Sequence, residues 1–503
     1  MQEIPDKKLY IIVFLTGAIV MVMELVGSRL MAPVLGTSVF VWTSLIGIIL
    51  GAMSLGYYLG GKLADKKPTL KVFSSLTLAA GIFIFLIIIF KNPILDLSMF
   101  FGLKAGSVFA AIFLFSIPAL FLGAVSPYAV RLSMKKVESS GNTVGNLYAI
   151  STFGSIFGTF LAGFYLIPHF GGTNILYALA IMLFLISLFI YNNKARTIPI
   201  IVALFTLFGL SVGSNAMNKR ELLADEDSAY SHIRVWETED KNGRAVLVMS
   251  LENSFDSGMF LDSDELVFDY SKYFMLDKAF KKDIKKTVIF GGAAYSIPKE
   301  YLAKNKEGEI DVVEIDPRTT KLAKKFFRLE DNERMNIYHE DARIFLNNAD
   351  KNKKSQYDVV YNDAFNSACS VPFHLTTKEA VGKISNILND DGLYIMNMIS
   401  ALSGENSGFF RAEYKTLNEK FESIFVFPVR SRDENSSERV QNIVIIASKK
   451  KLDINDILKN NQEGEVGELL SGYWKYEVET GDIKVLTDDF APVNYYASKH
   501  CGL

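Results

Sequence analysis

The chain has 503 residues, more than one compact core usually holds, so we expect at least two domains. Half of its residues are hydrophobic, yet most of its 53 basic and 55 acidic side chains lie beyond residue 217. The net charge of −2 argues against a nucleic-acid partner, which needs a basic face. Cys369, Cys501 and five scattered histidines provide neither a disulfide framework nor a metal-ligand spacing, so we expect no structural metal.

Seven apolar runs in the first half predict membrane-spanning helices. Each run approaches or exceeds the roughly 20 apolar residues that a helix needs to cross a bilayer. The runs are residues 9–31, 39–61, 70–90, 105–130, 143–168, 171–191 and 197–214. We therefore expect a multi-pass protein of the cell membrane, with a transmembrane helical domain over residues 1–217 and the lipid bilayer as a partner. The stretch NPILDLSMFFGL is alternatively a re-entrant or interfacial segment.

Small residues recur at close-packing intervals in the second and fifth runs. They are Gly47, Gly51, Ser54, Gly60, Gly61, Gly154, Gly158 and Gly163. Such spacing predicts close helix packing in lipid, and a glycine-lined substrate path is the alternative. Glu24 and Arg29 lie inside the first run, where an ionisable residue is costly unless it is paired or near the interface. We expect Arg29 to reach the headgroups and Glu24 to pair with a neighbouring helix, with a ligand or ion site as the alternative.

Beyond the helices the apolar pattern changes to that of strands. Alternating segments around SHIRVWETE, GRAVLVMSL and SGMFLD predict a small β-hairpin subdomain with a linker over residues 218–284. From residue 285 strands alternate with helices, as in a parallel doubly wound sheet. The predicted strands are TVIFGG, EIDVVEID, NIYHED, YDVVYND, GLYIMNMI, SIFVFPV and QNIVIIASK. The last two follow each other without a helix, so residues 285–503 predict an α/β Rossmann-like methyltransferase fold with ligands at the carboxyl ends of the strands.

Acidic residues stand at the ends of three successive predicted strands. Gly291 and Gly292 follow the first strand, where missing side chains let backbone amides approach a ligand. Glu314 ends the second strand, Asp341 the third and Asp363 the fourth. A carboxylate after the second strand can accept both hydroxyls of a ribose. Because these strand ends meet at one edge, they predict a site for an adenosine-containing ligand, and an inert sheet edge is the alternative.

The motifs of the second half resemble those of spermidine-synthase-like proteins, in the same order. They are GRAVLVMSL, VIFGG, DVVEIDP, HEDARIFL, YDVVYNDAF, VPFHLTTKEA and LTDDFAPVN. The segments MELVGSRLMAPVLGTSVFVWTS and GYYLGGKLAD resemble the multi-spanning half of a membrane-fused branch of that family. The resemblance therefore covers nearly the whole chain. It implies S-adenosylmethionine or decarboxylated S-adenosylmethionine as the donor.

The resemblance also implies which residues bind the donor. In such proteins the glycine turn holds the aminopropyl or methionine tail, a glutamate binds the ribose, and an aspartate binds the adenine amino group. The residues that take these roles here are Gly291, Gly292, Ala294, Glu314, Asp341 and the adjoining Ala342.

Two departures from the family's pattern concern the reaction. The family's fourth-strand motif has a second aspartate, three positions after the first, that helps to deprotonate the attacking amine, and this chain has Asn366 there. Asparagine cannot serve as a general base at neutral pH. The synthases also carry an aspartate in a GGGDGG turn, where this chain reads GGAAYS with Ala294 at that position. Without that charge the turn accommodates the carboxylate of ordinary S-adenosylmethionine.

Three functions from different classes stay open. The leading one is a membrane-bound transferase that moves a methyl or aminopropyl group from the donor to an acceptor that stays open: a small molecule such as an amine, a lipid, or a membrane-protein side chain. The others are a nucleoside-binding sensor or transporter without catalysis, and a polyamine aminopropyltransferase with a substitute base. The candidates for the acceptor side and for catalysis are Asp363, Tyr361, His374 and Tyr270, with Asp488 and Asp489 closing over the pocket. The resemblance further implies a homodimer.

The basic residues in the loops predict on which side of the membrane each end of the helical half lies. Eleven basic residues flank the runs on the side of the amino terminus: Lys7, Lys8, Lys62, Lys66, Lys67, Lys71, Arg131, Lys135, Lys136, Lys194 and Arg196. The opposite loops hold Arg29, Lys91 and Lys104, so the positive-inside rule places the amino terminus in the cytoplasm. Seven crossings then leave the second half outside. S-adenosylmethionine is a cytoplasmic molecule, so this expectation conflicts with the transferase function.

Overall fold

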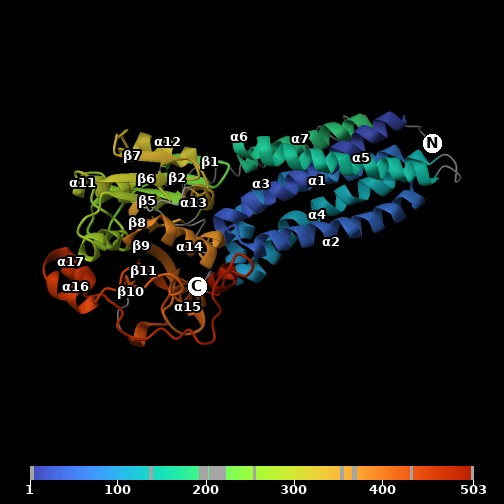
Figure 1. The fold of residues 1–503 in the computed structure, drawn as a ribbon. Coiled ribbons are helices and arrows are strands. Elements are labelled where there is room, and N and C mark those ends of the chain that lie inside the picture. The colour runs from blue at the N-terminus through green and yellow to red at the C-terminus, as the bar shows by residue number, and fades with distance from the viewer. Residues whose placement is uncertain are drawn as a thin grey trace. The chain divides into compact units, whose positions relative to one another are not determined.

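The computed structural model describes residues 5–134, 140–191, 202, 222–252, 257–351, 356–364, 371–430 and 434–499. These residues form two compact units (Figure 1). Helices up to residue 191 build the first unit, and the second is built by the strands and helices beyond residue 229 together with the first part of the strand at residues 222–227.

Six helices of the first unit are long and apolar enough to cross a membrane. They are α1 (Asp6–Leu35), α2 (Val39–Lys66), α3 (Leu70–Met99), α4 (Gly102–Ser133), α5 (Ser140–Leu161) and α7 (Gly172–Ile190). A π-helical turn, Ala162–Leu166, and the short α6 (Ile167–His169) extend α5. These helices correspond to the first six predicted runs, and the stretch NPILDLSM continues α3 rather than forming a separate segment. The seventh run lies, apart from Val202, outside the described residues.

Glycines bring two pairs of these helices into close contact: α1 lies beside α5, and α2 beside α4 (Figure 1). A Cβ at Gly154 would lie 2.0 Å from the main-chain oxygen of Phe14, and one at Gly158 would lie 2.4 Å from that of Ala18. Gly60 approaches α4 in the same way. The other predicted packing glycines contact no described residue within 4 Å at the Cβ position: Gly47, Gly51, Gly61 and Gly163.

Glu24 lies in α1 and is half-buried. Among the described residues it forms no hydrogen bond or ion pair, so the expected pairing with a neighbouring helix is not found there.

The second unit begins with a four-stranded sheet in the order β1-β2-β3-β4. Its strands are β1 (Leu222–Asp227), β2 (His232–Glu239), β3 (Ala245–Leu251) and β4 (Ser257–Phe260). β3 pairs antiparallel with β2 and with β4, so both of its edges are occupied. On one face of this sheet, Val235, Leu247 and Met249 pack against Ala294 and Phe327, which belong to the α/β part of the chain beyond residue 285.

A seven-stranded mixed sheet in the order β10-β11-β9-β8-β5-β6-β7 forms the centre of the second unit. Its strands are β5 (Lys286–Phe290), β6 (Glu309–Val313), β7 (Met335–Tyr338), β8 (Tyr357–Asn362), β9 (Leu388–Ser400), β10 (Ser423–Pro428) and β11 (Gln441–Ser448). The strands β5 to β9 are parallel, and β11 pairs antiparallel with both β9 and β10. Every strand predicted for this sheet is present.

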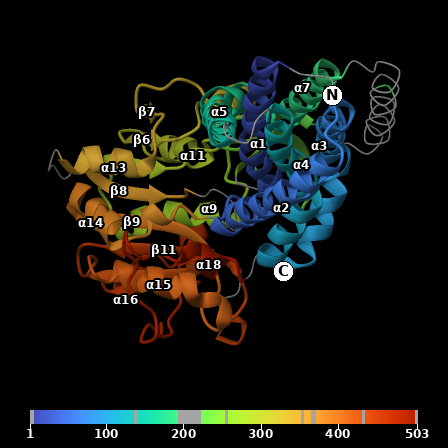
Figure 2. The same ribbon diagram turned by 90° about the vertical axis from the view of Figure 1, so that its right-hand side faces the viewer.

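Helices cover both faces of this sheet, because alternate residues of each strand point to opposite sides. One face packs on α13 (Ala342–Lys351), α14 (Lys378–Ile387) and α15 (Gly408–Leu417), and the first two are visible beside the strands in Figure 2. The other face packs on α11 (Ser296–Lys304), α12 (Pro317–Phe326) and α10 (Asp277–Phe280), together with α16 (Ile454–Asn460) and α17 (Gly464–Leu470). Both layers leave the carboxyl ends of β5, β6, β7 and β8 at one edge.

Candidate functional site

A strained turn joins β5 to α11. Gly291, Ala293 and Tyr295 have φ values of 93°, 45° and 60°, in the left-handed region that non-glycine residues rarely adopt. A Cβ at Gly291 would lie 2.8 Å from the main-chain oxygen of Asp363, so the turn packs directly on the end of β8. The buried ring of Tyr295 fills the space beneath the turn, and its hydroxyl lies 2.7 Å from Oγ1 of Thr320. The first strand end is therefore held in one conformation.

Glu314, directly after β6, fastens this turn. Its Oε2 accepts the main-chain N–H groups of Gly292 and Ala293 at 2.9 and 3.1 Å, and its Oε1 accepts that of Asp316 at 2.9 Å. The side chain is 5% exposed, and burial raises the pKa of its carboxyl while the three amide donors oppose that rise. A carboxylate accepts about four hydrogen bonds, so roughly one position is left for a ligand hydroxyl.

Asp341 lies just before α13, and its two carboxylate oxygens have different partners. Oδ1 accepts the main-chain N–H groups of Arg343 and Ile344 at 2.8 and 3.2 Å. Oδ2 lies 3.3 Å from Nε2 of His374, and this contact lowers the pKa of the Asp341 carboxyl. Arg343 in turn donates to the main-chain oxygen of His374 and to Asp488, each at 2.6 Å. The structure thus places His374 and Asp488 beside Asp341.

Asp363, directly after β8, is held by donors from two other elements. Tyr270, in the short helix α9 (Asp269–Lys272), donates its hydroxyl to Oδ2 at 3.2 Å. Asn397 of β9 donates its side-chain amide to Oδ1 at 3.0 Å, and Asn442 of β11 donates to Oδ1 of Asn397 at 3.1 Å. Of the predicted acceptor-side residues, Tyr270 is the one that contacts Asp363. The sequence reasoning missed Asn397 and Asn442.

Two predicted site residues point away from this edge. Tyr361 is fully buried and donates its hydroxyl to Oδ2 of Asp277 at 2.5 Å, within the layer of α10. Ala294 is also fully buried, and its methyl group packs in the apolar cluster beneath the four-stranded sheet. Ala342 is the first residue of α13, next to Asp341. Asn366 and Cys369 lie outside the described residues.

The chemistry of this edge suits hydrogen-bond donors and positive charge. Three carboxylates at the ends of β6, β7 and β8 accept hydroxyl, amino or cationic groups, and each is already held in place by protein N–H or O–H donors. Arg343, the basic residue at the start of α13, is engaged by Asp488 and therefore does not offer a free phosphate site. The arrangement fits a nucleoside with a cationic or polar tail better than a phosphorylated nucleotide.

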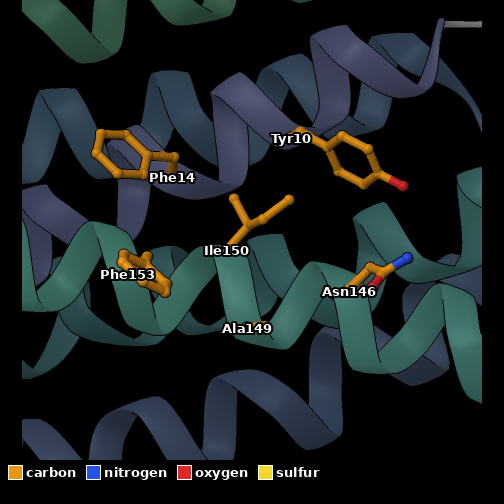
Figure 3. Close-up of a pocket in the computed structure, with 6 residues that line it drawn as sticks. All are labelled: Tyr10, Phe14, Asn146, Ala149, Ile150 and Phe153. Atoms are coloured by element: carbon orange, nitrogen blue, oxygen red, sulfur yellow. The ribbon is translucent and has the colours of Figure 1, made fainter.

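A separate hollow of about 460 Å³ lies between α1 and α5 of the helical unit (Figure 3). Its lining residues are Tyr10, Phe14, Asn146, Ala149, Ile150 and Phe153. In Figure 3, Tyr10 and Phe14 come from α1 and the other four side chains from α5, with Ile150 pointing toward α1. The lining is mostly apolar and holds no carboxylate, so it does not resemble the acidic edge of the second unit.

The strand order, with an antiparallel β11 inside an otherwise parallel sheet and the acidic row at the strand ends, defines a Rossmann-like domain of the methyltransferase fold. Residues 275–430 match the family model of the spermine/spermidine synthase domain. The C-terminal part of the chain therefore carries a spermine/spermidine synthase domain, and the resemblance seen in its motifs is confirmed there.

Two relatives with similar sequences agree with this match. The polyamine aminopropyltransferase of Vibrio vulnificus is 24% identical over 243 residues, which are 47% of this chain and 77% of that protein. Polyamine aminopropyltransferase 2 of Aquifex aeolicus is 25% identical over 408 residues, which are 76% of this chain and 77% of that protein. That stretch is longer than the second unit, so it extends into the helical half. A probable spermidine synthase from Corynebacterium glutamicum, known as a crystal structure, aligns with 19% identity and a TM-score of 0.41 over 53% of this chain and 99% of its own.

Proposed function

We propose that the second unit is a transferase that binds an S-adenosylmethionine-type donor along the ends of β5, β6, β7 and β8. It moves an aminopropyl or methyl group to a small acceptor molecule. The observation that carries this proposal is the row of Glu314, Asp341 and Asp363, each oriented by donors from the protein itself. The family of the domain supports the same class of reaction.

Each of the three carboxylates binds a different part of the donor in this proposal. Glu314 accepts a ribose hydroxyl with its remaining position, and the outward Oδ2 of Asp341 accepts the amino group of the base. When bound, the donor supplies an alkyl group activated by a sulfonium. Asp363 and the Tyr270 hydroxyl lie at the end where that positive charge and the acceptor are expected to meet. A carboxylate there stabilises a cationic donor and orients an incoming amine.

Calorimetry with the full-length protein in detergent tests the donor class. We expect binding of S-adenosylmethionine, its decarboxylated form or S-adenosylhomocysteine, and no comparable binding of adenosine monophosphate. Glu314→Ala is expected to lower affinity about ten- to a hundredfold. Glu309→Ala, at the exposed opposite end of β6, is the matched control and should bind normally. Absence of binding of all three nucleosides to the native protein would rule the proposal out.

Turnover separates the transferase from a second candidate, a nucleoside-binding sensor or transporter. One observation favours the second candidate: both oxygens of Asp363 already accept hydrogen bonds. The resemblance adds an expectation, since it places Asn366 where the family has its second aspartate. With donors labelled in the methyl or aminopropyl group, a transferase releases labelled product, and Asp363→Asn abolishes it. A sensor binds without product, and in that case Asp363→Asn abolishes tight binding.

The side of the membrane is a further test of the transferase. A cytoplasmic donor requires the second unit to face the cytoplasm. In a background that lacks Cys369 and Cys501, a cysteine introduced as Lys450→Cys should then react with an impermeant probe only after lysis. Reaction in intact cells would place the domain outside, as seven crossings predict.

We also propose that two copies of the chain pair. The occupied edges of β3 mean that this strand cannot extend its sheet into a second copy, so pairing uses a face of the sheet or another element. Light scattering of the detergent-solubilised protein, corrected for bound detergent, distinguishes a dimer from a monomer.

A further inference from the structure

Two side chains from neighbouring strands and one from the residue after a third strand form a hydrogen-bonded row across the large sheet. Asn442 of β11 donates Nδ2–H to Oδ1 of Asn397 at 3.1 Å. Asn397 of β9 donates Nδ2–H to Oδ1 of Asp363, after β8, at 3.0 Å. The row runs diagonally across the antiparallel pair, because the residue opposite Asn397 is Val444.

The direction of each bond in this row matters. A side-chain amide has one acceptor end and one donor end, so whichever end Asn442 occupies decides which end Asn397 turns to Asp363. Asn442 occupies the carbonyl oxygen, which leaves the N–H group for the carboxylate. With the Asn397 amide reversed, its oxygen would face a carboxylate oxygen, and both are acceptors.

Burial makes this orientation consequential. Asn397 is 5% exposed and lies in β9 between Met396 and Met398, which are buried on the opposite face. An amide in such a place needs partners for both ends, because an unpaired buried polar group costs free energy. Asn442 therefore has a task that no apolar residue of β11 can take over.

We propose that Asn442 is a positioning residue of the candidate site, which acts through Asn397 to keep Asp363 an ionised acceptor for the positive charge of a ligand. This inference rests on the proposed function for the identity of the ligand. A titratable group that is hydrogen-bonded to Asp363 within the described part of the chain is Tyr270, and it donates to the other oxygen. Neither asparagine contacts the S-adenosylmethionine-type ligand in this proposal.

The chain offers a matched control at the other end of the same two strands. Asn389 of β9 donates Nδ2–H to Oδ1 of Asp358 in β8 at 2.8 Å. This bond joins the same residue types on the same strands, but it lies away from the ligand edge. A general effect of weakening the pairing of β8 and β9 would appear in Asn389→Ala as well as in Asn442→Ala.

The experiment compares the affinities of S-adenosylmethionine, with a cationic sulfonium, and S-adenosylhomocysteine, with a neutral sulfur, for full-length variants over a range of pH. We expect Asn442→Ala to reduce the preference for S-adenosylmethionine about two- to tenfold, as for the loss of one hydrogen bond. Asn389→Ala should keep the native preference.

Asn442→Asp should give a larger change in the same direction. Aspartate cannot donate, so the Asn397 amide turns its N–H to residue 442 and its oxygen to Asp363. Asp363 is then protonated more readily, and the preference for the cationic ligand disappears at a higher pH than in the native protein. The added negative charge also favours protonation of Asp363, so Asn442→Ala, which adds no charge, decides. An unchanged preference in Asn442→Ala overturns the proposal.

A second readout needs no ligand. The infrared band of the protonated Asp363 carboxyl, identified by its loss in Asp363→Asn, should appear at higher pH in Asn442→Ala, which adds no charge, than in the native protein. If neither nucleoside binds the native protein, the proposed function fails, while this band still decides the role of Asn442. A band that appears at the same pH in both proteins contradicts that role.

Discussion

The carboxylate of Glu314 and the main-chain amide of Gly292 are joined directly, since Oε2 of the one accepts the N–H of the other at 2.9 Å. The same oxygen accepts the amide of Ala293, so a single side chain after β6 fixes the turn after β5. The residue expected to bind the ribose therefore also builds the wall of its own site.

This double role predicts a loss of stability when Glu314 is changed. In Glu314→Gln the amide nitrogen cannot accept, so at least one main-chain N–H is left unpaired in a buried place. We expect the ligand-free protein to lose about 1 to 3 kcal/mol, measured by chemical unfolding of the full chain. Glu309→Gln should lose nothing measurable. If Glu314 served the ribose alone, its variants would unfold like the native protein without ligand.

Gly291 tests the contact between the turn and the end of β8. In Gly291→Ala the new methyl group meets the main-chain oxygen of Asp363 at 2.8 Å, and φ stays at 93°. Gly243→Ala, with a φ of 77° and no described atom within 4 Å, carries the backbone cost alone. Gly243→Ala should lose roughly 1 to 2 kcal/mol of stability, Gly291→Ala should lose more, and only Gly291→Ala should also weaken nucleoside binding. Equal binding by the two variants would contradict the contact.

Glu413 predicts a dependence of stability on pH. It is fully buried on α15, both of its oxygens lack a hydrogen-bond partner among the described residues, and burial raises the pKa of its carboxyl well above the usual value. The folded pKa lies above the unfolded one, so stability is complete below the unfolded pKa and is lost as pH rises through the folded pKa. We expect thermal unfolding at a lower temperature near pH 8 than near pH 5.

Two variants check the assignment to Glu413. Glu413→Leu should remove part of this pH dependence and stabilise the protein near pH 8 by about 1 to 3 kcal/mol. The exposed Glu419, just beyond α15, is the control, and Glu419→Leu should leave the profile unchanged. A native profile in Glu413→Leu would mean that the carboxyl is not a source of the dependence.

The helical unit offers a matched pair of glycines in α5. In Gly154→Ala the methyl group would lie 2.0 Å from the main-chain oxygen of Phe14, so α1 and α5 must separate. At Gly145 the same change meets no described atom within 4 Å. We expect the first variant to lower the unfolding temperature in detergent and the second to leave it unchanged. Equal unfolding temperatures of the two variants would contradict the close contact between Gly154 and Phe14.

The strands and the long apolar helices could be predicted because their signals are local. Apolar runs of sufficient length indicate helices in lipid, and the change to strand, helix and strand after residue 285 indicates a doubly wound sheet. The three strand-end carboxylates followed from the same pattern. The helix α15 was missed, because its apolar face lies between two strong strand signals.

The placement of Tyr361 and Ala294 away from the ligand edge could not be predicted, for a different reason. The sequence places Tyr361 two residues before Asp363, but it does not reveal that Asp277, 84 residues earlier, lies over that part of the sheet and accepts the hydroxyl. Ala294 likewise meets an apolar face of the four-stranded sheet that only the tertiary packing defines. Ala294→Asp, which would introduce the charge that the resemblance leads one to expect, would therefore bury a carboxylate in an apolar cluster. Asn397, inside the apolar run YIMNMI, was a signal that could have been used, since a lone amide in a buried strand usually marks a hydrogen-bonded partner.

β11 is the last strand of the chain, yet it lies inside the sheet, between β9 and β10. During synthesis β9 leaves the ribosome earlier, and its edge stays open until β11 inserts beside it. Asn442 arrives with that final strand, so Asp363 receives its orientation at the end of folding rather than when its own strand forms. A nascent or truncated chain that ends before residue 441 would carry the whole acidic row in a sheet with an exposed edge, prone to pair with other chains.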